Sequence, residues 1–118
     1  MGGTVISVGD NPQLLSLRHA VLERAGYHVI TASDPNTASQ TIASAPCDVL
    51  LLCYSMEINT RQRLAKEFRE HCPDGRIIAI TNQYQQRPPL GADAFLYGLE
   101  GAEALLDAVR AQMEARTA

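Results

Sequence analysis

Cys53 is the side chain of this sequence that is best placed to do chemistry. It ends the apolar run 48–53, which reads as a buried strand. In an open α/β sheet, reactive and ligand-binding groups collect beyond the carboxyl ends of the strands. A thiol at such a place reacts as a thiolate, which a neighbouring cation or a helix amino terminus must stabilise. Without such a neighbour, Cys53 is a small apolar side chain packed at the end of a strand.

Two more polar side chains follow strand-like runs. Asp10 comes after the first apolar run, where it or Asn11 can cap a helix that begins at Pro12. Thr81 follows the fourth run and carries a hydroxyl at the corresponding place. The histidines and cysteines lack the spacing of metal ligands, and no trio of nucleophile, base and orienting group is visible in the sequence. We therefore expect no enzymatic activity.

The elements that would position these residues alternate along the chain. Apolar runs predict strands over 4–8, 27–31, 48–53, 76–80 and 92–97. Helical spacing of apolar residues predicts helices over 12–25, 35–45, 61–72 and about 102–115. Strict alternation with short connections favours a parallel sheet that is covered by helices on both faces.

Length and composition indicate one small globular domain. With 118 residues, 46% of them hydrophobic, the chain can bury a single core. The net charge of −3 is mild, and we expect Arg61, Arg63, Lys66 and Arg69 to form a solvated helix face, so nucleic acid is not an expected partner. The sequence shows neither a membrane span nor a signal peptide. The cysteines are interpreted as free thiols, which favours a cytoplasmic location.

Five segments, taken in order, resemble the receiver domain of two-component response regulators. They are residues 8–12, 22–34, 47–52, 77–81 and 91–96, and together they extend over nearly the whole chain. The resemblance implies one receiver-like domain over residues 1–118, with its core at about 3–115. It also implies a flavodoxin-like (CheY-like) α/β fold, doubly wound, with a five-stranded parallel sheet of order 2-1-3-4-5.

The resemblance also places a phosphorylation site on this chain, with most of its parts missing. In the family, an aspartate after the third strand accepts the phosphoryl group, two acids hold Mg²⁺, and a hydroxyl and a lysine bind the phosphoryl oxygens. Here the acceptor position is Cys53, and the two acidic positions are Gly9 and Asp10. The hydroxyl is retained as Thr81, whereas the lysine position falls on Gly98.

These departures predict that the site no longer accepts a phosphoryl group. Sulfur is a poor ligand for magnesium and Asp10 alone is a weak residual site, so Mg²⁺ binding is expected to be weak or lost, and no other cofactor is implied. The nearest charge expected at Cys53 is that of Asp10, which is negative and favours the protonated thiol. Phe95 matches the aromatic residue that changes rotamer in the family, so part of a two-state coupling could persist.

The segment after the fourth predicted strand is shorter than in the family. The deficit falls in residues 82–90, which contain two adjacent prolines, so the family's fourth helix is expected to be shortened or missing. Its loss would expose the flank of the sheet near Phe95. A protein partner or a second copy of the chain, in a homodimer, would cover the resulting candidate interaction surface, which consists of Tyr84, Pro88, Pro89 and Tyr97.

The sequence therefore predicts an atypical, phosphorylation-independent receiver domain. It would act in signal transduction as a protein-interaction or dimerisation module, in the cytoplasm, without contacts to nucleic acid or membrane. Two alternatives stay open at this point. One is a thiol-based redox sensor that uses Cys53, and the other is a small-ligand-binding module of flavodoxin-like fold.

Overall fold

Strands and helices alternate along the chain in the computed structural model, as the hydrophobic pattern predicts. The structure describes residues 3–45, 48–53, 56–81, 91–97 and 101–117. The strands are β1 (Thr4–Val8), β2 (His28–Ala32), β3 (Val49–Cys53), β4 (Arg76–Thr81) and β5 (Ala94–Tyr97). The helices are α1 (Pro12–Arg24), α2 (Pro35–Ser44), α3 (Ile58–His71) and α4 (Ala102–Thr117).

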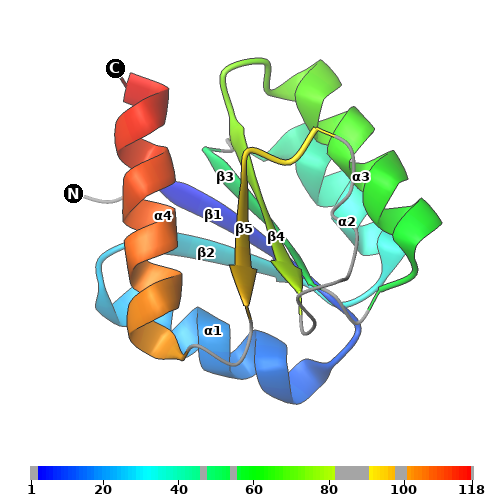
Figure 1. Ribbon diagram of the computed structural model, residues 1–118. Helices are drawn as coiled ribbons and strands as arrows, with labels where there is room; N and C mark the ends of the chain where they lie inside the picture. The colour runs from blue at the N-terminus through cyan, green and yellow to red at the C-terminus, as the bar shows by residue number, and fades with distance from the viewer. Residues whose placement is uncertain (1–2, 46–47, 54–55, 82–90, 98–100, 118) are drawn as a thin grey trace.

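The five strands form one parallel sheet (Figure 1). Their order is β2-β1-β3-β4-β5, which confirms the predicted flavodoxin-like topology. The register places Val8 beside Leu52, and it places Cys53 beside Ile80. The carboxyl ends of β1, β3 and β4 therefore meet at the same edge of the sheet.

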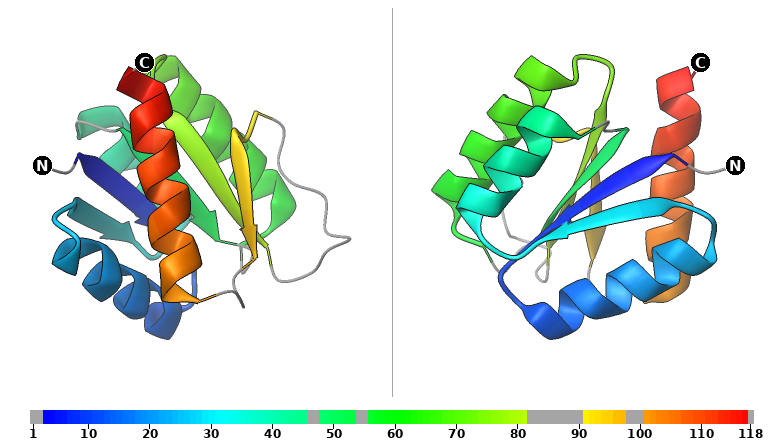
Figure 2. Two further views of the ribbon diagram at one scale, coloured as in Figure 1. Left: turned by 60° about the vertical axis from the view of Figure 1, so that its left-hand side comes forward. Right: turned by 180° about the vertical axis from the view of Figure 1, so that it is seen from behind.

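Helices cover both faces of the sheet. Helices α2 and α3 pack against each other on one face, and α1 and α4 lie on the other (Figure 2). Strand β3 is buried along its whole length, and its side chains alternate between the two cores. Leu50 and Leu52 belong to the core under α2 and α3, whereas Val49 and Leu51 belong to the core under α1 and α4. Burial on both faces explains why β3 is a continuous apolar run.

The polar residues before α1 and α2 cap these helices. The Asn11 side chain accepts hydrogen bonds from the backbone N–H groups of Gln13 and Leu14 at 3.1 and 3.2 Å, so Asn11 is the cap of α1. Asp34 caps α2 by accepting a 2.8 Å bond from the backbone N–H of Thr37. That bond lowers the pKa of the Asp34 carboxyl, because it favours the charged form.

An ion-pair network ties the amino end of β5 to α3 and β4. The Arg69 guanidinium donates to the carbonyl oxygen of Gly75 at 2.6 Å and also binds the Asp93 carboxylate. Asp93 in turn accepts from the backbone N–H of Ile77 at 2.7 Å, and its own N–H donates to the Ile77 carbonyl at 2.8 Å. The network lies at the amino ends of the strands and therefore orients β5 without taking part in the carboxyl edge.

Helix α3 corrects two expectations from the sequence. It begins at Ile58, earlier than the predicted start at residue 61. Its basic residues do not form one solvated face: Arg63 and Lys66 are exposed, but Arg61 is only 3% exposed. Arg61 lies three and four residues before Leu64 and Ala65, so it shares their buried face.

The cysteines do not all carry free thiols, contrary to the sequence-based expectation. Cys72, at the end of α3, is disulfide-bonded, whereas Cys53 is buried and forms no disulfide. Cys47 lies outside the described residues. The argument from free thiols to a reducing compartment therefore applies only to Cys53.

In the described part of the chain, no helix is both long and apolar enough to cross a membrane.

Candidate functional site

The carboxyl edge of the sheet brings together three residues that the sequence singled out. Gly9 directly follows β1, Cys53 ends β3, and Thr81 ends β4. These three strands are neighbours in the sheet, so the residues at their ends are neighbours too. This edge is where ligands bind in open α/β sheets, and it is the place that the sequence predicts for the site.

Gly9 and Cys53 are packed against each other. A Cβ atom built on Gly9 would lie 2.9 Å from Cys53 Cβ, 3.5 Å from Cys53 Sγ and 3.5 Å from Leu15 Cδ2. Carbon atoms in contact are normally about 3.5–4.0 Å apart, so any side chain at position 9 must displace its neighbours. Gly9 is not among the glycines with positive φ in the described residues. Glycine is therefore required here by the close approach and not by the backbone conformation.

Cys53 is shielded from solvent, with 1% of its surface exposed. This agrees with a small apolar side chain packed at a strand end. The backbone around it is held in place: the N–H of Gly9 donates to the Ala32 carbonyl at 3.2 Å, and the N–H of Met56 donates to the Cys53 carbonyl at 3.2 Å. A small molecule could reach the sulfur only if these segments moved apart.

Arg61 is the residue of this site that sequence reasoning missed. Its side chain is buried, and its Nε atom has no hydrogen-bond partner in the described structure. Burial lowers the pKa of the Arg61 guanidinium, and its charge interaction with Cys53 opposes that lowering. Besides Asp10, the charge that the sequence places near Cys53, the site thus contains a positive charge. The helical spacing of Arg61 with Leu64 and Ala65 was the signal that could have placed it inside.

Asp10 lies at the edge of a cavity and not inside the packed site. Its side chain is exposed, and it is Asn11 that caps α1. The cavity has a volume of about 190 Å³ and lies among the loops that follow β1, β2 and β3. It is lined by Gly9, Asp10, Ser33, Asp34, Pro35, Met56, Glu57 and Thr60. Across the described ranges, no group of three or more histidine, cysteine or acidic side chains is arranged to hold a metal ion.

Thr81, at the end of β4, lies beside one of the two aromatic residues of β5. Thr81 is 8% exposed and pairs with Tyr97 in the register of β4 and β5. Tyr97 is half-buried, whereas Phe95 is 52% exposed. The retained hydroxyl is thus buried near the site, and Phe95 is in an outward position.

Part of the predicted site falls outside the described residues. This applies to Gly98, at the position of the family's lysine, and to Tyr84, Pro88 and Pro89 of the candidate interaction surface. It also applies to residues 82–90, where a shortened or missing fourth helix is predicted. Within the described residues, four helices accompany the five strands.

No protein-family model matches the chain, and neither does a curated protein. Solved structures do match it, over nearly its whole length. The response regulator TrrA from Thermotoga maritima, in complex with Mg²⁺ and BeF, superposes with a TM-score of 0.82 at 24% identity, covering 95% of this chain and 99% of that chain. A CheY-like receiver domain protein from Methanospirillum hungatei gives 0.86 at 17% identity, covering 99% and 98%.

A third similar structure is the receiver domain of a sensor histidine kinase from Pseudomonas aeruginosa, with a magnesium ion in its active-site cleft. Its TM-score is 0.84 at 21% identity, and the match covers 97% of this chain and 99% of that one. The structural neighbours are thus receiver domains of the CheY-like type. They show that this chain has their fold.

Proposed function

We propose that this chain is a receiver domain that works without phosphorylation, as a protein-interaction or dimerisation module in signal transduction. It has no catalytic activity of its own and needs no metal ion. The fold of receiver domains supports the first half of this proposal. The packing of Gly9 against Cys53 is the observation that carries the second half.

The packed contact removes what phosphoryl transfer requires. In the resembled family, oxygen atoms at these two positions attack the phosphorus and bind Mg²⁺. Here one position has no side chain and the other is a buried thiol, and a Cβ at position 9 would lie 2.9 Å from Cys53 Cβ. Mg²⁺ prefers oxygen ligands, so a thiol and one exposed carboxylate, Asp10, are a poor site for it.

Arg61 adds an electrostatic reason. Its guanidinium is buried and lies close enough to Cys53 for the two groups to interact electrostatically. A fixed cation in a poorly hydrated interior repels a second cation more strongly than it would in water. Mg²⁺ would therefore meet both too few ligands and an unfavourable charge at this edge of the sheet.

An Mg²⁺ and beryllofluoride titration tests the loss of the site, because these are the species named in the Thermotoga complex. We expect the backbone amide signals of Gly9, Cys53 and Thr81 to stay unchanged as both are added. The variant Cys53→Asp serves as a comparison that restores an oxygen ligand. Saturable shifts of these three signals in the natural chain would contradict the proposal.

The exposed aromatic of β5 supports an interaction surface. Phe95 is 52% exposed, and β5 is the last strand of the sheet order, so one side of its backbone has no strand neighbour in the described structure. Exposed large apolar groups on an edge strand favour association with another chain. A protein partner or a second copy of this chain would cover Phe95.

Sedimentation equilibrium tests the dimer form of the interaction. We expect a concentration-dependent dimer that Phe95→Ser weakens by at least tenfold and that Leu17→Ser, a control at another exposed apolar residue, leaves intact. A natural chain that stays monomeric would exclude the homodimer and leave a different protein as the partner.

We propose a cytoplasmic location for the domain, where the reducing conditions would favour reduction of the Cys72 disulfide.

A further inference from the structure

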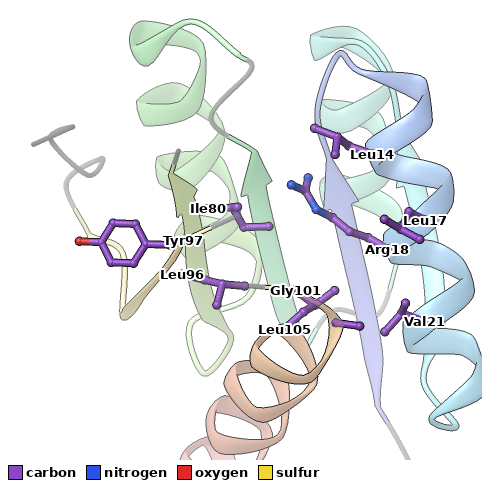
Figure 3. Close-up of a pocket in the computed structure, with 10 residues that line it drawn as sticks. Leu14, Leu17, Arg18, Val21, Ile80, Leu96, Tyr97, Gly101 and Leu105 are labelled. Atoms are coloured by element: carbon purple, nitrogen blue, oxygen red, sulfur yellow. The ribbon is translucent and has the colours of Figure 1, made fainter. Parts of the chain in front are cut away.

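A second cavity lies away from the packed site, between α1, the ends of β4 and β5, and the start of α4 (Figure 3). Its volume is about 80 Å³, and one side of it opens to solvent past Leu17, which is 62% exposed. Its lining consists of Leu14, Leu17, Arg18, Val21, Ile80, Leu96, Tyr97, Gly101, Ala102 and Leu105. Most of this lining is hydrocarbon, so the cavity favours an apolar group.

Arg18 is the one charged side chain in the lining. It is 7% exposed, and among the described residues it has no hydrogen-bond or ion-pair partner. Figure 3 shows its side chain extending from α1 toward Ile80, across the space that the lining residues enclose. A buried charge without a partner is unfavourable unless a counter-charge joins it. The cavity thus presents an unneutralised positive charge to whatever enters it.

The amino terminus of α4 faces the same space. Gly101 and Ala102 line the cavity, and the first helical hydrogen bond runs from the N–H of Leu105 to the Gly101 carbonyl at 3.2 Å. The N–H groups that precede Leu105 have no partner within the helix, and the helix dipole makes this end positive. Glu103, the acid of the first turn, is exposed and does not line the cavity. Arg18 and the helix end therefore both favour an anion.

The size of the cavity limits the ligand. A cavity of about 150 Å³ holds benzene, so about 80 Å³ encloses roughly three or four non-hydrogen atoms. That suits a carboxylate group and its first methylene. A longer hydrocarbon tail would lie along Leu17 and Val21 toward the open side.

We propose that this cavity binds a short aliphatic monocarboxylate, with the carboxylate paired to Arg18 and the tail against the leucines of α1 and α4. Bound there, the ligand would touch α1, β5 and α4 at once. It would couple the position of β5, which carries Phe95, to the concentration of a small metabolite. This inference stands independently of the loss of phosphorylation, since it uses none of the residues at the Gly9–Cys53 contact.

Hexanoate is the probe, and its binding can be followed through backbone amide shifts in a titration at constant sodium chloride. We expect saturable shifts at Gly101, Ala102 and the α1 residues that line the cavity. Affinity is expected to rise from acetate to hexanoate, because each added methylene buries apolar surface. Hexanol, which has the tail without the charge, should bind at least tenfold more weakly.

Two variants separate the charge from the fold. Arg18→Gln should weaken hexanoate binding by at least tenfold, whereas Arg63→Gln, at an exposed arginine on α3, should leave it unchanged. If Arg18→Gln does not fold, the comparison of hexanoate with hexanol on the natural chain still decides the question. Hexanoate that causes no shifts, that binds no better than hexanol, or that binds Arg18→Gln equally well would overturn the proposal.

Discussion

The substitution Gly9→Ala tests the packed contact at the carboxyl edge of the sheet. It adds a single methyl group whose carbon would lie 2.9 Å from Cys53 Cβ. That is short of a normal carbon–carbon contact by roughly 0.6 Å or more. Gly9 and Cys53 are both buried: Gly9 directly follows β1, and Cys53 ends β3. The strain therefore cannot be relieved by moving an exposed side chain.

The expected loss follows from this strain. Overpacking a buried site by one methyl group typically costs about 1–3 kcal/mol in the free energy of unfolding. An unfolding entropy of about 2.1 cal/mol/K per residue over 118 residues converts this into a fall in Tm of about 4–12 °C. Urea unfolding measures the same loss as a lower midpoint at an unchanged m value.

The sign of the change in the free energy of unfolding shows whether Gly9 and Cys53 are closely packed. Where glycine is not required, Gly→Ala stabilises a protein by about 0.4–1 kcal/mol, because alanine restricts the unfolded chain. Gly9 lacks a positive φ, so this gain would appear if the site had room for a methyl group. A stabilised Gly9→Ala variant would therefore refute the close packing of Gly9 and Cys53.

A double-mutant cycle with Cys53 assigns the loss to the right atoms. Cys53→Gly removes the Cβ atom that the new methyl group would meet, whereas Cys53→Ala retains it. We expect the Gly9→Ala penalty to persist in the Cys53→Ala background and to shrink by at least about 1 kcal/mol in the Cys53→Gly background. Equal penalties in both backgrounds would place the strain elsewhere.

Three further predictions follow from the same structure. Alkylation of Cys53 in the folded chain should be slow, because this residue is buried. In the denatured, unreduced chain, alkylation should modify Cys53 and leave Cys72 unmodified, because Cys72 is disulfide-bonded. A modified Cys72 in a mass map of the peptides would show that the disulfide is absent. Asp93→Ala should lower the free energy of unfolding by about 1.5–3 kcal/mol, because it removes a partly buried ion pair and a backbone hydrogen bond. The control Asp107→Ala, which removes an exposed ion pair, should change the free energy of unfolding by less than about 1 kcal/mol. Equal urea midpoints for the two variants would contradict this prediction. An NMR titration should place the pKa of the Asp34 carboxyl below its ordinary value of 3.8. The contribution of this cap to stability is therefore complete above pH 3.8 and is lost as the pH falls through the lower pKa. A carboxyl that titrates at or above 3.8 would rule out the capping bond.

The fold was largely predictable because each element has a local signal. The run over β3 and the capping signals at Asn11 and Asp34 depend on residues close together in the sequence. The shared sheet edge of Gly9 and Cys53 then followed from the parallel topology. The tight contact between them could not be predicted, because it depends on the spacing of two strands and not on residue type.

Among the features that sequence reasoning missed, one has a local signal and two depend on contacts between distant parts of the chain. Arginine is a common residue on the solvated face of a helix, so the residue type of Arg61 does not indicate burial. Only its position in phase with the apolar face of α3 shows that it is buried. Arg69 pairs with Asp93, which is 24 residues away in the sequence. The cavity at Arg18 forms where α1 meets α4, at opposite ends of the chain.

Intact-mass measurement after incubation with acetyl phosphate and Mg²⁺ tests the central claim most directly. The natural chain and Cys53→Ala are measured together, so that any adduct can be assigned to the sulfur. We expect no phosphoryl adduct on either protein, because the buried thiol packed against Gly9 offers neither an oxygen nucleophile nor a magnesium site. A phosphoryl adduct on the natural chain that is missing from Cys53→Ala would contradict it and make Cys53 an acceptor.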